Sequence, residues 1–159
     1  MSAPGPMQGS RLLLPVQRAV TRLLATHPLL AGTPVLEELP GTVITEVTRA
    51  ADGLKRAVVV WPPEMLKYNL NFSGGVLFID DLAITVEAGE NPRLNEGSPV
   101  GVAALNERLA LVLLLTPLAV DGVWLNQLLP DARPYRLVPH PERRVYHHLF
   151  HTSCALTLP

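Results

Sequence analysis

The segment Val76-Leu77-Phe78-Ile79-Asp80-Asp81-Leu82-Ala83-Ile84-Thr85-Val86-Glu87 carries the clearest strand pattern in the chain. Apolar residues recur at every second position, with Phe78 and Leu82 on the apolar parity, while polar residues occupy the opposite parity at Asp81, Thr85 and Glu87. A period of two is typical of a strand that has one covered face. The segment therefore predicts a long strand against which the rest of the chain packs.

Two features modify this strand and end it. Asp80-Asp81 interrupts the alternation, which predicts either a β-bulge or a pair of carboxylates at a sheet edge. Asn91-Pro92 stops the extended chain, because proline fixes its own φ and pushes the preceding residue out of the helical region. Ser98-Pro99 then reads as a helix start, and the apolar segment 99–115 predicts a mostly buried helix that Pro117 ends.

The remaining elements follow from the same two periodicities. Residues 1–10 have no apolar period and predict a flexible arm, which leaves residues 11–159 as a single domain. The expected order is a helix over 13–26, a short strand over 34–39, a strand over 56–61, irregular connections over 62–75 and 119–134, and strands over 135–138 and 145–158. Between the first two strands, the β-branched residues of 42–54 favour a strand, but the spacing of its apolar residues favours a helix, which we prefer. This order predicts an α+β fold with a mainly antiparallel sheet and helices packed on one face.

Composition limits the classes of function. Only 17% of the residues are charged and the net charge is −1, whereas soluble domains average about 25% charged residues. The low charge indicates that other subunits cover part of the surface. The 13 Lys and Arg residues are scattered, which argues against nucleic acid as the main partner. Cys154 is the sole cysteine, so no internal disulfide can form, and no apolar run is long enough to span a bilayer.

Four histidines near the C-terminus invite a metal hypothesis. His140, His147, His148 and His151 lie within a dozen residues of one another. On a strand, His147 and His151 would be about 13 Å apart at roughly 3.3 Å per residue, too far to share an ion. A solvated or interfacial strand face is the preferred interpretation, and we predict no metal and no cofactor.

Other residues that could carry chemistry also have simpler interpretations. Cys154 falls on the apolar parity of the last strand, where a small buried thiol is more common than a nucleophile. Asp80-Asp81 are adjacent on a strand and so face opposite ways. Gly74-Gly75 lacks the following lysine of a phosphate-binding loop. The sequence therefore predicts that the protein is not an enzyme.

The order of features resembles small tail-assembly proteins of tailed bacteriophages, of the tail terminator or tail completion family. The resemblance spans roughly residues 13–115 and rests on layout: the N-terminal helix, PVLEEL at 34–39, RAVVVWPP at 56–63, VLFIDDLAITVEAGENPRLNEG at 76–97, and the apolar helix. It implies a subunit of a hexameric ring that caps the tail tube, ends its polymerisation and meets the head-side connector. The family has no catalytic residues to transfer. The 119–134 segment and the histidine-bearing last strand depart from the family's pattern.

The resemblance also implies partners and contact residues. The partners would be other copies of the chain, the tail tube protein and a connector or neck protein, in a virion assembled in the bacterial cytoplasm. Neither a membrane nor specific nucleic-acid binding is implied, although DNA could pass through the ring. The expected contact surfaces are 62–75, 88–98 and 119–134, with these interface residues: Tyr68, Phe72, Glu87, Glu90, Arg93, Asn95 and Trp124. A head-completion protein, or a cytosolic ligand binder or enzyme, remains an alternative.

Overall fold

The computed structural model describes residues 9–38, 53–71, 74–95 and 100–157. Its helices are α1 (Leu13–Thr26) and α3 (Val100–Leu115), with short 3-10 turns η1 (Pro28–Leu30) and η2 (Pro92–Asn95). Its strands are β1 (Val35–Glu37), β2 (Arg56–Val60), β3 (Glu64–Asn71), β4 (Val76–Glu90), β5 (Val123–Leu125), β6 (Leu129–Val138) and β7 (Arg144–Thr157). The strands predicted over 34–39, 56–61 and 145–158 are therefore confirmed as β1, β2 and β7.

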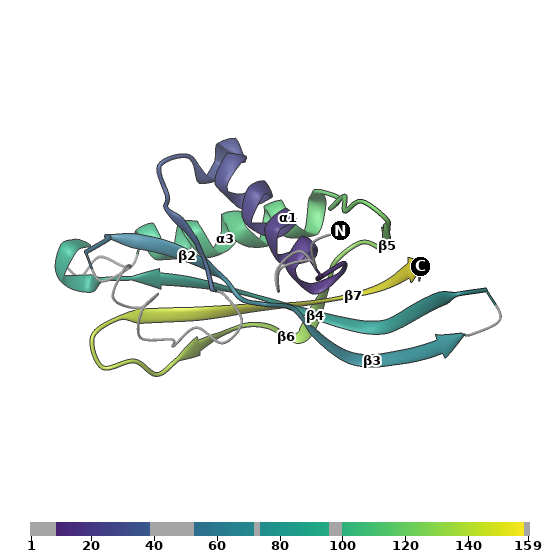
Figure 1. Ribbon diagram of the computed structural model, residues 1–159. Helices are drawn as coiled ribbons and strands as arrows, with labels where there is room; N and C mark the ends of the chain where they lie inside the picture. The colour runs from purple at the N-terminus through teal and green to yellow at the C-terminus, as the bar shows by residue number, and fades with distance from the viewer. Residues whose placement is uncertain (1–8, 39–52, 72–73, 96–99, 158–159) are drawn as a thin grey trace.

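The sheet is built on two long antiparallel strands, β4 and β7 (Figure 1). They pair from Val76 opposite Thr157 to Glu90 opposite Arg144. At the end where Val76 pairs with Thr157, which we call the tip, β3 pairs with β4 and β5 pairs with β7. At the opposite end, β2 pairs with β4 and β6 pairs with β7. Only β1 and β2 run parallel among the described strands. The predicted α+β fold with a mainly antiparallel sheet is confirmed.

A β-bulge lies in β4 at the position of the two aspartates. Its register with β7 shifts between Ile79 and Leu82, and the register with β3 shifts opposite the same place. Odd-numbered residues of β4 face the core before the bulge, and even-numbered residues face it afterwards. Ile79 and Leu82 are therefore both buried. The bulge prediction is confirmed, but the placement of Phe78 on the covered face is wrong, because Phe78 precedes the bulge and is 41% exposed.

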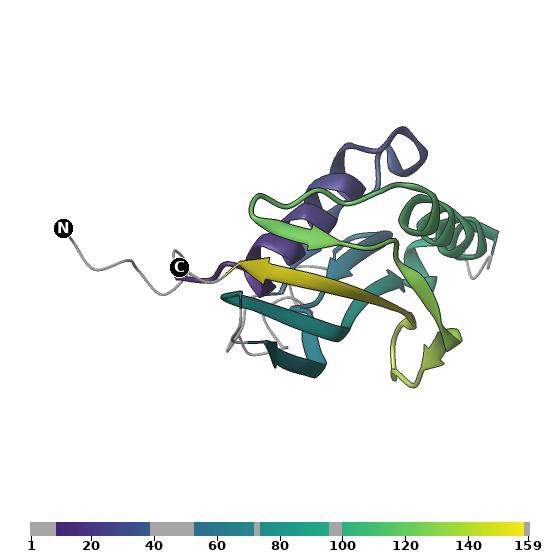
Figure 2. The same ribbon diagram turned by 90° about the vertical axis from the view of Figure 1, so that its right-hand side faces the viewer.

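The two helices of the described residues cover the same face of the sheet (Figures 1 and 2). α1 has the predicted bounds and buries Val16, Val20 and Leu24 completely. α3 packs its Leu105 and Leu109 side against the sheet. Its outward side carries exposed apolar residues, including Leu115 at 74% exposure, so the prediction of a mostly buried helix is wrong. A helix lying on one sheet face has only one side to bury within a single chain.

Two segments predicted as irregular connections are strands. The 62–75 segment contains β3, and the 119–134 segment contains β5 and the first half of β6. β3 and β6 are edge strands that expose most described residues on both faces, so they lack the alternation that marks a half-covered strand. Pro130 and Pro134 are tolerated in β6 because an edge strand has a side on which no N–H is needed.

Several predictions lie outside the described residues. These are most of the arm over 1–10, nearly all of the helix over 42–54, Phe72, and the helix start at Ser98-Pro99. Among the residues that are described, no helix combines the length and apolar character needed to cross a bilayer.

Candidate assembly surfaces

An uncovered aromatic surface lies at the tip, on the sheet face opposite the helices. Phe78 of β4 and Trp124 of β5 both stand in register with Ala155 of the intervening strand β7, so the three side chains form one row across the sheet. Trp124 is 81% exposed, an unusual exposure for so large an apolar side chain. We call this row the tip platform. Of the predicted interface residues, Trp124 lies on it.

A hollow of about 500 Å³ adjoins the tip platform. Its walls are mainly apolar, and its polar residues include Asp80, Asn126 and Ser153. Asn126 Nδ2 donates to Ser153 Oγ at 2.5 Å, so these two side chains satisfy each other. Cys154 also lines the hollow, and burial raises the pKa of its thiol to about 11. The thiol is therefore protonated near neutral pH and is a poor nucleophile.

The edge strand β3 presents further apolar residues near the tip. Met65 and Leu66 are exposed, and Tyr68, another predicted interface residue, is 60% exposed. Exposed apolar edge strands pair readily with other chains unless something covers them. β6 has the same character through Leu129 and Leu137. Both edges are therefore suited to contact with another subunit.

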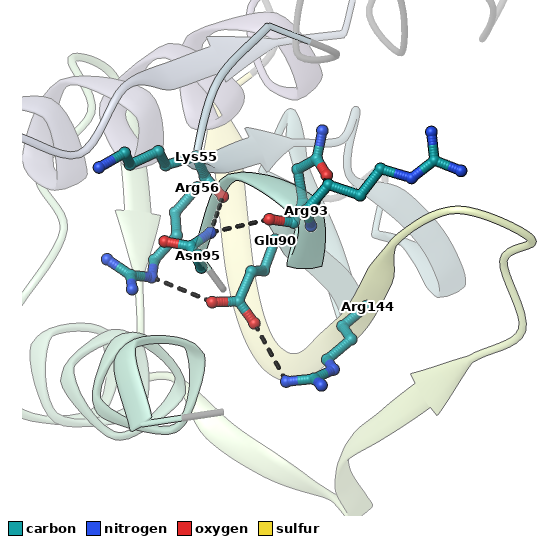
Figure 3. A network of polar contacts seen from close by, with 7 residues as sticks. Lys55, Arg56, Glu90, Arg93, Asn95 and Arg144 are labelled. Atoms are coloured by element: carbon teal, nitrogen blue, oxygen red, sulfur yellow. Dashed lines mark hydrogen bonds and ion pairs between the residues drawn. The ribbon is translucent and has the colours of Figure 1, made fainter. Parts of the chain in front are cut away.

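The opposite end of the sheet holds a buried ionic cluster (Figure 3). Arg56 of β2, Glu90 of β4 and Arg144 of β7 are register partners, which places the carboxylate between two guanidinium groups. Arg56 Nε lies 3.4 Å from Glu90 Oε1, and Arg144 Nη1 lies 3.5 Å from Glu90 Oε2. The Glu90 side chain is fully buried, and each arginine side chain is about one-third exposed. We call these three residues the ionic cluster.

Gly101 at the start of α3 makes room for the ionic cluster. A Cβ atom at this position would lie 1.8 Å from Nη2 of Arg56. The missing side chain thus allows the guanidinium group to pass close to the helix backbone. The ionic cluster consequently connects three strands of the sheet to the first turn of α3.

The η2 turn beside the cluster is held by its asparagines. Asn95 Nδ2 donates to the carbonyl oxygens of Lys55 and Asn91, at 2.9 Å in each case. Asn91 Oδ1 accepts from the backbone N–H of Arg93 at 3.1 Å. The Arg93 side chain is exposed and points away from the ionic cluster (Figure 3). Asn95 therefore shapes the turn, whereas Arg93 projects from it.

The residues predicted as an interface separate into exposed and internal groups. Tyr68 and Trp124 are exposed towards the tip, and Arg93 is exposed at the opposite end. Glu90 is buried, and half-buried Glu87 lies with its Oε1 3.1 Å from Nε2 of His147. The burial of Glu90 could not be predicted from the sequence, because its arginine partners lie far away along the chain.

The C-terminal histidines each have separate partners. His147 contacts Glu87, His148 Nε2 lies 2.8 Å from Asn106 Oδ1 of α3, and His140 Nδ1 accepts from backbone N–H groups of its own turn. His148 is buried, and burial together with the charge of His147 lowers its pKa to about 4. Within the described part of the chain, no group of three or more His, Cys, Asp or Glu residues is arranged to hold a metal ion.

His151 joins the bulge to the edge strand β6. Its Nδ1 lies 2.6 Å from Asp81 Oδ1 and its Nε2 lies 2.6 Å from Asp131 Oδ1. Burial alone would lower the pKa of His151, but hydrogen bonds and charges from both aspartates together raise it. A protonated imidazole can donate to both carboxylates at once. We call this trio the histidine clamp.

The histidine clamp is expected to make stability depend on pH. Because the folded pKa is above the unfolded value of about 6.5, the clamp stabilises fully below pH 6.5 and loses its contribution as the pH rises through the folded pKa. The variant His151→Gln should therefore lose about 1 kcal/mol more stability, relative to the parent protein, at pH 5.5 than at pH 9. Urea unfolding at both pH values measures this difference. An equal loss at both values would mean that the clamp is not charged.

Comparison with models of known protein families finds no match, and comparison with curated proteins finds none. The fold does match a solved structure. One chain of a structure described as the virion of a native gene transfer agent particle aligns with a TM-score of 0.62 and 17% identity, over 92% of this chain and 99% of that chain. The two chains share a fold. At this identity, the likeness concerns the arrangement of elements and not individual residues.

Proposed function

We propose that the protein is a structural virion component of a tailed bacteriophage or a related particle. It forms a ring that caps the tail tube and joins it to the head-side connector. The resemblance of its sequence layout to tail terminators implies that this ring has six subunits. The observation that carries this proposal is the alignment with nearly the whole of a chain from a gene transfer agent virion. A match over 99% of that chain means that the shared fold accounts for the whole virion subunit and not for one part of it.

The surface supports an assembled state. Exposed apolar residues occur on the tip platform, on the β3 and β6 edges and on the outward side of α3. These surfaces lie on different sides of the subunit, as neighbours in a ring and partners above and below it would require. Pairing of edge strands between copies would also remove edges that promote aggregation in a monomer.

The mechanism would be stoichiometric and not catalytic. A ring bound to the last ring of tube subunits blocks further addition and offers a new surface to the connector. The tip, with Trp124 and Tyr68, and the η2 end, with Arg93, are suited to different partners because one is aromatic and the other is charged. In this proposal the protein needs no cofactor, binds no specific nucleic acid sequence and is not an enzyme.

A head-completion or other neck protein is the second candidate, because it would use the same ring and the same surfaces. Its position in the particle separates it from a tail terminator. The hollow at the tip has a volume typical of ligand sites, which leaves a small-ligand binder as a more distant candidate. Asn126 and Ser153 bond to each other there, so fewer polar groups converge on a ligand.

A tube-capping assay tests the proposal. Tail tube protein of the same virion is allowed to polymerise with and without the purified protein, and tube lengths and ends are measured by negative-stain electron microscopy. We expect shorter tubes that carry a ring at one end. Bare tubes of unchanged length would argue against a terminator, and rings bound only to head connectors would favour the neck protein.

Arg93 provides a residue-level test in the same assay. Arg93→Glu reverses an exposed charge on η2 without touching the ionic cluster, so we expect weaker capping and an unchanged melting temperature. Arg18→Glu, an equal change at an exposed position on α1, is the matched control and should cap normally. Normal capping by Arg93→Glu would mean that the η2 surface does not contact the tube.

A further inference from the structure

The tip platform and its hollow form an aromatic groove that the described part of the chain leaves open. Trp124 and Phe78 stand on either side of the small residue Ala155, which leaves a shallow channel between two rings. Among the residues lining the hollow, Asp80 is the only charged one. A groove of this kind suits an uncharged extended segment that offers apolar groups at short intervals.

We propose that residues 1–8 of a neighbouring copy dock in this groove, so that each subunit of the assembly clasps the next. The inference rests on the proposed function in one respect, since an assembly brings the neighbouring copy within reach. The occupant is thus a segment of this same chain, Met1-Ser2-Ala3-Pro4-Gly5-Pro6-Met7-Gln8.

The composition of this segment fits the groove. It has no charged side chain and contains two prolines and two methionines. Proline-rich segments favour the extended polyproline II conformation and dock in grooves lined by aromatic side chains, because little conformational entropy is lost on binding. Methionine sulfur also makes favourable contacts with aromatic rings. Exposed Trp124 is the side chain that such a segment would use most.

The position of Gly9 favours a neighbouring copy over the same chain. Gly9 lies beside Leu77 and Leu156, on the helix-bearing face, whereas Phe78 and Trp124 lie on the opposite face of the same strands. Eight extended residues span roughly 27 Å. To reach the groove of its own chain, the segment would have to pass around an edge strand. This path costs about 4.8 Å for each strand crossed and about 10 Å for the thickness of the sheet, which is most of the length of the segment. The same segment of a neighbouring copy can enter the groove without passing around an edge strand.

Peptide binding tests the docking itself. Protein lacking residues 1–8 is titrated into a fluorescently labelled peptide of residues 1–9, and binding is followed by fluorescence anisotropy. We expect saturable binding that Trp124→Ala weakens at least tenfold, whereas Leu115→Ala, a truncation of an equally exposed apolar residue on α3, leaves it unchanged. A peptide with both prolines replaced by serine should bind more weakly. No binding, or equal binding by Trp124→Ala, would overturn the proposal.

Cross-linking of the full chain tests whether docking occurs between copies. In a Cys154→Ala background, Met7→Cys and Asn126→Cys are combined, and the oxidised protein is separated on a non-reducing gel. Docking between copies gives covalent dimers and larger ladders, whereas a disulfide within one chain, or none, would overturn docking between copies. Peptide binding by a protein that forms no ring would leave the docking intact and refute the proposed function. Rings without peptide binding would refute the docking and leave the proposed function intact.

Discussion

Replacing Glu90 by lysine is expected to destabilise the subunit by about 4 kcal/mol. The substitution removes the carboxylate that lies between Arg56 and Arg144 and places a third cation in a fully buried position. The cost is large because the new ammonium group would lie beside two guanidinium groups, at a position that water does not reach. For a chain of this length, the melting temperature should fall by roughly 10 °C.

Arg93→Glu is the matched control for this measurement, since it reverses a charge at an exposed position on the neighbouring turn. Its melting temperature should stay within about 2 °C of the parent protein. Charge reversal at Arg93 is therefore expected to leave the subunit folded, whereas charge reversal at Glu90 is not. Equal and small effects of the two variants would show that Glu90 is exposed to water in solution.

Acidification is expected to destabilise the protein through His148. Because its folded pKa of about 4 lies below the unfolded value of about 6.5, the unfolded state takes up a proton that the folded state excludes. The contribution of His148 is therefore complete above pH 6.5 and is lost as the pH falls towards 4. Between pH 7 and pH 4.5 this amounts to about 2 kcal/mol.

The variant His148→Gln isolates this effect, because glutamine can contact Asn106 but does not titrate. Its stability should fall by about 2 kcal/mol less than that of the parent protein over the same pH interval. Parallel profiles for His148→Gln and the parent protein would mean that His148 is protonated in the folded state.

The sequence predicts those elements whose two faces differ. α1, β4 and β7 each bury mainly one side, so their periodicity gives both their type and their approximate bounds. β2 is buried on both faces, and its continuous apolar run identifies it instead. Even the bulge was predictable, since Asp80-Asp81 interrupts the alternation. Its consequence for Phe78 was not, because only the pairing with β7 determines which parity faces the core after a register shift.

The edge strands and the buried cluster were beyond sequence reasoning for different reasons. β3 and the first half of β6 expose both faces, and a strand with two exposed faces has no period that separates it from a loop. The second half of β6 was predicted, as the strand over 135–138, and is confirmed. Glu90 looks like a surface carboxylate in sequence, and its burial depends on Arg56 and Arg144, which reach it only when three strands align. The structure places Trp124 on the surface at 81% exposure, and its role as an interface residue stays a prediction.

The mass of the purified protein in solution shows whether the subunits form a ring. Size-exclusion chromatography with light scattering gives this mass with and without added tail tubes, and negative-stain imaging of the peak shows its shape. We expect rings of about six times the 17.3 kDa subunit mass, either alone or once tubes are present. A stable monomer that neither forms rings nor associates with tubes would contradict this expectation.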